Sequence, residues 1–169
     1  MTVRAPAKNK KPSVRKSGQS IWLKNAEKIC AEKGVALTDV RALVLGIIAG
    51  AARPVGAYDI LSEMAKTMDN PKPPTAYRAI EFLQAQRLIH RIESLNAYIA
   101  CHADHQHDGS QFMICDGCGQ VEEVHVCHLP RVLADRAATS GFETQRWNVE
   151  LHGLCRACAT GALTAAGCK

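Results

Sequence analysis

The sequence predicts an α+β protein in which a mainly helical unit is followed by a smaller unit of strands and one helix. Three observations support this fold class. Apolar residues recur at helical spacing up to about residue 86, short β-type runs follow, and two Cys-x-x-Cys pairs lie in the second half. A chain of 169 residues holds one ordinary domain or two small ones, which excludes a large catalytic fold.

Four helices are expected before the β-type runs. They cover residues 20–33, 38–49, 57–67 and 75–86. Gly34 and Gly50 are expected to end the first two, because glycine readily adopts the backbone geometry that closes a helix. Thr38 and Thr75 are expected to cap the second and the fourth. The proline-rich segment 70–74 separates the last two helices.

A β-hairpin is expected after the helices. Residues 88–93 and 97–101 are short β-type runs that flank a turn. With Leu95-Asn96 as a two-residue turn, paired residue numbers sum to 191, so that His90 lies opposite Cys101 with Cβ atoms about 5 Å apart. Helices followed by a two-stranded hairpin are typical of a winged helix-turn-helix, whose last helix enters the DNA major groove while the hairpin forms the wing.

A second unit is expected after a polar, His-rich connector over residues 102–110. Its expected elements are strands over 112–115 and 120–126, a helix over 129–139 and a strand-like run over 142–151. Pro130 suits the first turn of the helix, and Gly141 is expected to end it. Such a unit has a thin core, which a bound metal would staple.

Positive charge is concentrated at the N-terminus. Residues 1–16 carry six Lys and Arg and no acidic residue, although the net charge of the whole chain is only +5. This flexible arm is expected either to contact DNA phosphates or to act as a solubilising tail. No apolar run approaches the roughly 20 residues of a membrane span. No signal peptide is evident, so a cytoplasmic location is expected.

The two Cys-x-x-Cys pairs predict a structural zinc site. Cys115 and Cys118 form one pair, Cys155 and Cys158 form the other, and 36 residues separate them. Each pair brings two sulfurs to one ion with little strain, and two pairs complete a closed tetrahedral shell that favours zinc. A closed shell has no position for a reacting water, so the site is expected to be non-catalytic. The alternatives are redox-active dithiols or unrelated thiols.

A second metal site is expected around the hairpin, in a stretch that holds six of the seven histidines. His90 and Cys101 supply two ligands of the kinds that zinc accepts. Further candidates are His102, His105, His107, Glu122, Glu123 and His125. Each histidine taken alone would be a solvated loop residue, whereas the cluster as a whole favours metal binding. Such a site would straddle the hinge between the two units.

Six segments together resemble the ferric uptake regulator family, and in particular its zinc uptake regulator branch. They are Leu37–Arg41, Ala57–Leu61, Lys72–Leu83, His90–His102, Phe112–Gly119 and His152–Cys158. The resemblance implies a homodimeric, metal-dependent repressor that binds double-stranded operator DNA, with no membrane or small-molecule substrate. It implies a basic flexible arm over 1–18, a winged-helix DNA-binding domain over 19–101, a His-rich hinge over 102–110 and a dimerisation and zinc-binding domain over 111–169.

The resemblance also implies roles for individual residues. The structural zinc ligands would be Cys115, Cys118, Cys155 and Cys158, and the regulatory ligands His90, Cys101, His107 and Glu123, with about two zinc ions per chain. Tyr58 and Arg78 match positions that contact DNA bases, and Thr75 and Tyr77 lie beside them. Iron-sensing relatives usually carry a denser histidine run and no equivalent of Cys101, so the resemblance favours zinc.

The expected function is zinc-dependent repression of zinc uptake genes, in which zinc at the hinge locks the dimer in the operator-binding pose. Alternatives are an iron, manganese or peroxide sensor of the same family, or a thiol redox switch. A deaminase is excluded because no His-x-Glu precedes a Pro-Cys-x-x-Cys motif, and nucleotide-binding fingerprints are also absent. A third metal site built from Cys30, His125, Cys127 and His128 is left open.

Overall fold

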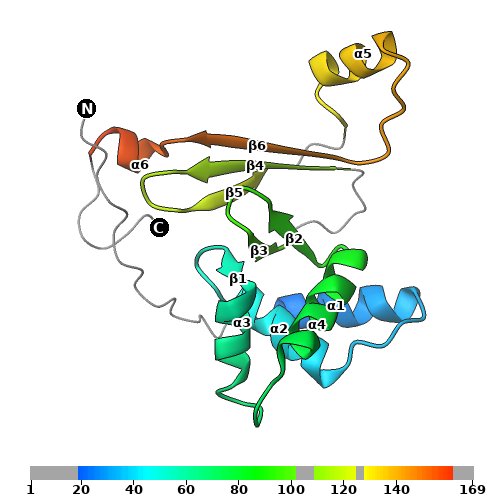
Figure 1. Cartoon of the computed structure of the whole chain (residues 1–169), viewed down its shortest axis with the longest axis vertical. Helices are drawn as coiled ribbons and strands as arrows, with labels where there is room; N and C mark the ends of the chain where they lie inside the picture. The colour runs from blue at the N-terminus through cyan, green and yellow to red at the C-terminus, as the bar shows by residue number, and fades with distance from the viewer. Residues whose placement is uncertain (1–18, 102–108, 125–127, 162–169) are drawn as a thin grey trace.

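The computed structural model describes residues 19–101, 109–124 and 128–161, so the predicted arm over residues 1–18 lies outside them. Two tiers make up the described part (Figure 1). Four helices with a small sheet form one tier, and a second sheet with two helices forms the other. This arrangement confirms the predicted α+β class. Within the described residues, no helix has the length and apolar character needed to cross a membrane.

The prediction of four N-terminal helices is confirmed. They are α1 (Gln19–Glu32), α2 (Asp39–Ala49), α3 (Ala57–Met64) and α4 (Pro73–Ala85). α2 begins directly after its N-cap residue Thr38, as expected, although the Thr38 side chain makes no capping hydrogen bond, and Gly50 follows the helix. α3 is shorter than predicted, because the N–H groups of Lys66 and Thr67 bond to carbonyls three residues back and the helix gives way to tight turns.

The start of α4 differs from the prediction. Its N-cap is Lys72 rather than Thr75, and Pro73 and Pro74 occupy its first two positions. Proline suits these positions because first-turn N–H groups have no partner within the helix, and because its fixed φ matches the helix. The proline-rich segment therefore begins α4 instead of only separating it from α3.

One apolar core joins the four helices and the small sheet. Its largest fully buried members are Val44, Leu45, Ile60, Met64, Ile80, Leu83, Ile89 and Cys30. On α4 the buried residues Ala76, Ala79, Ile80 and Leu83 recur at helical spacing. Burying one aliphatic side chain of this kind stabilises the fold by roughly 1.5–3 kcal/mol. The core thus fixes which face of α4 is turned outward.

The predicted wing belongs to a three-stranded antiparallel sheet with the order β1-β3-β2. Its strands are β1 (Val55–Gly56), β2 (Ile89–Ile92) and β3 (Ala97–Ala100). β1 pairs with β3 where Val55 lies opposite Tyr98. A strand of two residues carries no periodic pattern, which is why the sequence does not predict it.

The predicted register of the hairpin is wrong by two residues. His90 pairs with Ile99 and not with Cys101, because residues 93–96 form a four-residue turn in place of the expected two-residue one. A shift of two residues keeps every side chain on the same face of the sheet, since side chains alternate along a strand. Cys101, whose N–H donates to Leu88 O at 3.0 Å, therefore lies on the face of His90, diagonally across the ladder.

A second three-stranded sheet, with the order β5-β4-β6, organises the C-terminal unit. Its strands are β4 (Gly109–Cys115), β5 (Val121–Val124) and β6 (Trp147–Gly153). β4 pairs antiparallel with β5 and parallel with β6. The helix α5 (Arg131–Thr139) therefore lies in the crossover from β5 to β6, and the short helix α6 (Arg156–Ala159) follows β6.

Parallel pairing sets two strand boundaries that differ from the predictions. β6 pairs residue for residue with β4 from Trp147 opposite Gly109 onward. β6 therefore starts at Trp147 rather than at residue 142. β4 reaches back to Gly109, inside the predicted hinge over 102–110. The Trp147 ring packs on the backbone at Gly109, where a Cβ atom would lie 2.1 Å from the ring. Only glycine permits this approach.

The wing packs directly on the second sheet. Ile92 of β2 is buried together with Phe112 and Ile114 of β4 in a small second core. This contact places β2 against β4, and in Figure 1 the strands of the wing lie below β4 and β5, where the two tiers meet. Residues of the hairpin therefore meet residues of β5 and β6 on either side.

Candidate metal centres and nucleic-acid interface

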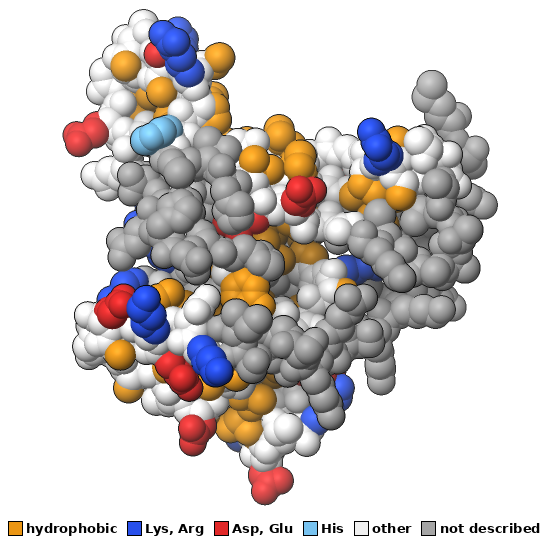
Figure 2. All heavy atoms as spheres, turned by 180° about the vertical axis from the view of Figure 1, so that it is seen from behind, with side chains coloured by type: hydrophobic (Ala, Val, Ile, Leu, Met, Phe, Trp, Pro, Cys, Tyr) orange, Lys and Arg blue, Asp and Glu red, His pale blue; other side chains and the backbone are white. Residues whose placement is uncertain are grey.

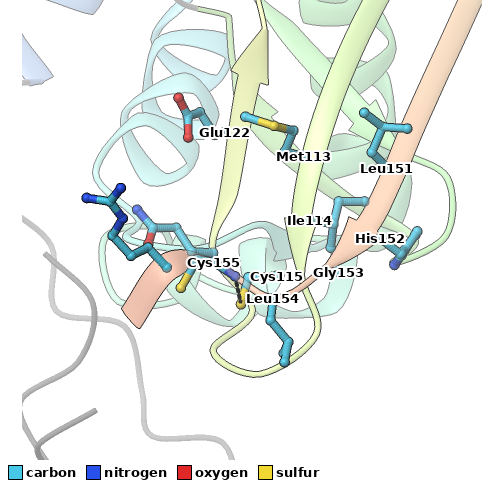
Figure 3. Close-up of a pocket in the computed structure, with 11 residues that line it drawn as sticks. Met113, Ile114, Cys115, Glu122, Leu151, His152, Gly153, Leu154 and Cys155 are labelled. Atoms are coloured by element: carbon cyan, nitrogen blue, oxygen red, sulfur yellow. Dashed lines mark hydrogen bonds between the residues drawn. The ribbon is translucent and has the colours of Figure 1, made fainter. Parts of the chain in front are cut away.

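Four cysteine side chains converge at the end of the second sheet. Cys115 ends β4, and Cys118 follows in the turn. Cys155 lies directly before α6, and Cys158 lies within it. Figure 3 labels Cys115 and Cys155. The Sγ atoms of Cys115 and Cys158 are 3.4 Å apart, and those of Cys118 and Cys155 are 3.9 Å apart. Four sulfurs around one zinc at about 2.3 Å would lie about 3.8 Å from one another. The spacing fits a single tetrahedral ion.

The charge balance of these thiols favours a bound cation. The backbone N–H of Cys155 donates to Cys115 Sγ at 3.2 Å, and this bond, with contacts from Cys118 and Cys158, lowers the pKa of Cys115 to about 6 against the effect of burial. Burial and contact with the other sulfurs raise the pKa of Cys158. One thiolate forms readily, whereas further thiolates repel it unless a cation neutralises them.

The turn between the first two cysteines has no room for a side chain at position 117. A Cβ atom on Gly117 would lie 2.9 Å from Cys158 Sγ and 3.1 Å from the Leu154 side chain. Because real Cβ atoms do not approach sulfur so closely, any other residue would push α6 away from the turn. Gly117 is thus part of the geometry that brings the four sulfurs together.

A second cluster lies where the wing meets the second sheet. His90 of β2, Cys101 just after β3 and Glu123 of β5 present ligand atoms that all lie within 4.8 Å of one another. His90 Nε2 lies 3.1 Å from Glu123 Oε1, and the two side chains are only 16% and 6% exposed. Nitrogen, sulfur and carboxylate oxygen are the three ligand types of protein-bound zinc. A metal held here would connect the two units.

The buried ring nitrogen of His90 has no hydrogen-bond partner. Nε2 is close to Glu123 without the alignment of a hydrogen bond, and no other buried side-chain nitrogen or oxygen in the described residues lacks a partner. The second ring nitrogen, Nδ1, lies 3.0 Å from Ser110 Oγ. In the neutral ring, with Nδ1–H donating to Ser110, Nε2 has a lone pair that faces Cys101 and Glu123. A metal-binding histidine is usually oriented in this way.

The electrostatic environment of His90 also suits a cation. Burial lowers the pKa of His90, but interactions with Cys101 and Glu123 raise it by more, to about 9. Without a metal, the His90 ring is therefore positively charged at neutral pH, with a proton on Nε2 as well as on Nδ1. The proton on Nε2 occupies the place of a cation, and a metal must displace it before Nε2 can act as a ligand.

The described residues separate some of the predicted ligands from others. Glu122 and Glu123 are neighbours on β5, where Glu122 is exposed and Glu123 faces the wing. Cys30 is buried in the core of the first unit and His128 is exposed, and neither joins a ligand cluster within the described residues. The candidates His102, His105, His107, His125 and Cys127 lie outside the described residues.

Two side chains at the join of the units are missed by the sequence interpretation. Ser110 on β4 orients His90. Glu150 on β6 accepts hydrogen bonds from the backbone N–H groups of Glu93 and Ser94 in the wing turn. Neither residue belongs to a motif, and each contacts a segment at least 20 residues away, so no local pattern signals the contact.

The outward face of α4 carries the residues predicted to contact DNA. Tyr77 and Arg78 are exposed, and Thr75 is half-buried. Tyr58, in the first turn of α3, is 79% exposed, which is unusual for so large a side chain. The first turn of α4 contains no acidic residue, so no carboxylate there repels a phosphate. This surface is suited to a groove of DNA.

The second unit leaves apolar side chains exposed in two places. Around α5, Val132 is 80% exposed, and Leu133 and Phe142 are also largely exposed. Near the four cysteines, Leu151 and Leu154 line a pocket of about 380 Å³ (Figure 3). α5 stands apart from the rest of the fold in Figure 1, and hydrophobic side chains are visible on its lobe in Figure 2. Helix α5 has no buried residue at all among its nine.

The chain is similar to metal uptake regulators over most of its length. The sequence model of the ferric uptake regulator family matches residues 32–152 of the chain. The zinc uptake regulation proteins of Escherichia coli (strain K12) and Shigella flexneri are each 39% identical to the chain over 137 residues, which cover 80% of this chain and 80% of each relative.

Solved structures give the same result. A zinc uptake regulator complexed with zinc and DNA is 38% identical, covers 87% of this chain and 99% of its own, and superposes with a TM-score of 0.80. The holo form of XcZur is 40% identical, covers 84% and 99% of the two chains, and has a TM-score of 0.76. Both the sequence and the fold are therefore shared with these regulators.

Proposed function

Because the chain belongs to the ferric uptake regulator family, we propose that it is a zinc-dependent DNA-binding repressor, not an enzyme, that controls genes for zinc uptake. The cluster of His90, Cys101 and Glu123 carries this proposal, since its buried donors join the winged helix to the second sheet. Relatives named for zinc uptake regulation support the choice of metal, and the similar structure that contains zinc and DNA supports the choice of partner.

The proposed regulatory ligands are His90, Cys101, Glu123 and one histidine of the connector, which the family resemblance assigns to His107. A thiolate ligand favours zinc over manganese and magnesium, which prefer oxygen ligands. It also favours zinc over ferrous iron, whose sites use nitrogen and oxygen ligands. The unpartnered Nε2 of His90 supports a bound cation at this position.

A second zinc ion per chain is proposed at Cys115, Cys118, Cys155 and Cys158. These four thiolates fill every position of a tetrahedral ion, so the site would be structural. It would tie β4, its turn and α6 together at the end of a sheet that has a small core. The regulatory and structural sites together give about two zinc ions per chain.

The mechanism follows from which elements carry the regulatory ligands. Zinc, when bound, would supply directed bonds that fix the distances between its donors. His90 and Cys101 then hold the wing, and Glu123 holds β5, in one relative pose. In a dimer this pose sets the separation of the two α4 helices, which must match half-sites about one helical turn of DNA apart. The free energy of zinc binding thus favours the DNA-binding pose over other poses.

The proposed DNA contacts divide into two kinds. Arg78 on the outward face of α4 is suited to two hydrogen bonds with the edge of a guanine, and Tyr58 to a thymine methyl group or a base edge. Thr75 and Tyr77 at the start of α4 are suited to phosphates, as is the basic arm over residues 1–18. The first kind of contact would specify sequence, whereas the second would position the protein.

The proposed partner of the second unit is another copy of the same chain. α5 exposes Val132 and Leu133 on a helix that buries nothing in the single chain. Apolar surface of this kind is typically covered in the assembled protein. We infer that α5 forms part of a homodimer interface, so that the predicted domain over residues 111–169 acts as the dimerisation domain.

Native mass spectrometry and DNA selection together test this proposal. The proposal predicts two zinc ions per chain in a dimer, and enrichment of one duplex sequence from a random library only when zinc is present. Equal DNA enrichment without metal would overturn zinc dependence. Enrichment of the same duplex by iron or manganese, at a lower free concentration than zinc needs, would show that the regulatory metal is not zinc. Zinc-free protein with reversible disulfides at the Cys-x-x-Cys pairs would instead indicate a redox switch.

A further inference from the structure

The turn of the wing is attached to the second sheet by a carboxylate that is not a metal ligand. Glu150 Oε1 accepts the backbone N–H of Glu93 at 2.7 Å, and Oε2 accepts that of Ser94 at 3.1 Å. Both donors lie in the four-residue turn between β2 and β3, whereas Glu150 lies on β6. The Glu150 side chain is only 13% exposed, whereas the donor residues Glu93 and Ser94 lie at the surface.

The carboxylate of Glu150 is held in this position as a charged acceptor. Asn148 Nδ2 donates to Oε1 at 3.3 Å. Burial raises the pKa of Glu150, but hydrogen bonds from Ser94, Glu93 and Asn148 lower it by more, so that the pKa lies below its ordinary value. Glu150 is therefore ionised at neutral pH and makes charge-assisted hydrogen bonds, which are stronger than neutral ones.

A second contact beside Glu150 leads to the four-cysteine turn. The His152 ring lies on β6 between the two units, with Nε2 3.1 Å from Ser94 Oγ and Nδ1 3.0 Å from Asp116 Oδ1. Asp116 directly follows Cys115, so the wing turn is linked through one ring to the turn that carries the proposed structural zinc. Glu150 and His152 thus hold the same residue, Ser94, from one strand.

We propose that Glu150 is a positioning residue for DNA binding, which latches the wing turn to β6 and is required, besides the hinge metal site, to fix the wing on the dimerisation domain. This inference rests on the proposed function. The donors His90 and Cys101 attach the wing to one edge of the second sheet, at Glu123 of β5. The bonds from Glu93 and Ser94 to Glu150 hold the turn after β2 at the other edge, on β6, and so fix the angle between the wing and the sheet.

The wing contacts all three strands of the second sheet. His90 faces Glu123 of β5, and its other ring nitrogen lies 3.0 Å from Ser110 of β4. Ile92 packs on Phe112 of β4, and the turn bonds to Glu150 of β6. The order β5-β4-β6 means that the hairpin spans the whole width of the sheet. The apolar contact resists separation of the two units but is non-directional, so the polar contacts of His90 and of the turn set the angle.

Glu150 can be altered without touching either proposed zinc site, because it belongs to neither ligand cluster. Glu150→Ala removes both acceptors, and Glu150→Gln keeps the shape of the side chain but loses its charge. Glu143→Gln is the matched control, since Glu143 is an exposed residue in the loop before β6. All three variants should carry two zinc ions per chain and sediment as the wild type does.

Two measurements test the latch independently. The first is amide hydrogen exchange of Glu93 and Ser94 in the zinc-loaded full-length protein without DNA. Both amides should exchange at least about tenfold faster in Glu150→Ala than in the wild type and the Glu143→Gln control, because their acceptors are gone. Unchanged exchange in Glu150→Ala and Glu150→Gln would overturn the attachment itself, whatever the function of the protein.

The second measurement is affinity for the duplex that the zinc-loaded wild type selects from a random library. At saturating zinc, Glu150→Ala should bind this duplex about tenfold or more weakly, Glu150→Gln should be intermediate, and Glu143→Gln should match the wild type. Equal affinity of all four proteins would overturn the positioning role. Failure of the wild type to require zinc for DNA binding would instead overturn the proposed function, while hydrogen exchange still decides the attachment.

Discussion

At the scale of single residues, the hinge site depends on how the ring of His90 is held. Its Nδ1 lies against Ser110 and its Nε2 against Glu123, with Phe112 5.5 Å from the ring centre. Neither Ser110 nor Phe112 can bind zinc at this position, yet both restrict the direction of the Nε2 lone pair. A ligand that is already oriented loses less conformational freedom on binding.

Replacing Ser110 with alanine should therefore weaken zinc binding at the hinge site. The loss of the partner of Nδ1 should lower affinity by about 10–100-fold, the range typical of residues that orient metal ligands. Competition with a chromophoric chelator measures the zinc affinity of the hinge site, which we expect to be the weaker of the two zinc sites. Ser62→Ala, which alters an exposed serine on α3, is the control. Identical affinity in Ser110→Ala and Ser62→Ala would show that Ser110 does not orient His90.

Gly117 offers a residue-scale test of the four-cysteine site. In Gly117→Ala the new methyl group would lie 2.9 Å from Cys158 Sγ, so α6 must shift and the tetrahedral arrangement is lost. The variant should lose one zinc ion per chain and unfold at a lower temperature, because metal binding stabilises a small domain. Gly153→Ala is the control, since a Cβ there meets no atom within 4 Å. Gly117→Ala with full zinc content and wild-type thermal stability would contradict this account.

At the scale of helices and strands, the first unit follows closely from local pattern. The spacing of apolar residues defines α1 to α4 because each helix buries one face in a shared core. Errors occur where a boundary depends on something other than periodicity. Pro73 and Pro74 start α4 because of their backbone geometry, and β1 exists only because β3 offers it a partner.

The hairpin shows how a wrong register can still give the right site. The sequence does not reveal that the turn has four residues, so His90 is assigned the wrong partner. The error is an even number of residues, and the alternation of side chains therefore keeps His90 and Cys101 on one face. An error of one residue would have separated them.

The C-terminal unit could be predicted only in part. The Cys-x-x-Cys pairs identify the four-cysteine cluster because the ligand types and spacing are local signals. The parallel pairing of β4 with β6 and the contact of Glu150 with the wing depend on residues more than 30 positions apart. No pattern within either segment carries that information.

α4 provides the element-scale test of DNA recognition. Arg78→Ala should reduce affinity for the selected duplex by about 1–3 kcal/mol and relax base preference at one position, because two hydrogen bonds to a base edge are lost. Arg146→Ala, which removes an exposed arginine of the second unit, should leave base preference unchanged. Repeating the random-library selection measures both. An unchanged preference in Arg78→Ala would place Arg78 off the bases.

At the scale of the whole molecule, the two tiers are joined by few contacts, and several of these are polar. The apolar part is the small cluster of Ile92, Phe112 and Ile114, which is much smaller than the core of the first unit. The relative pose of the tiers therefore depends on the donors at the hinge and on Glu150. Such an arrangement makes the pose sensitive to a bound ion, which is what a metal sensor requires.

Assembly through α5 is testable at this scale. Leu133→Asp combined with Val132→Asp would place charges in an apolar interface, so the variant should sediment as a monomer at concentrations where the wild type is a dimer. Thr160→Asp, at an exposed residue after α6, is the control for added charge. A double variant that remains a dimer would show that α5 is not the interface.

The central claim is that zinc at the hinge controls DNA binding, and anisotropy titration of the selected duplex at buffered free zinc tests it most directly. The wild type should bind the duplex steeply over a narrow range of free zinc. Cys101→Ser should keep the dimer and the structural zinc but lose this response, because serine is a poor zinc ligand and the hinge pose is no longer favoured. A zinc midpoint for Cys101→Ser equal to that of the wild type would contradict the account.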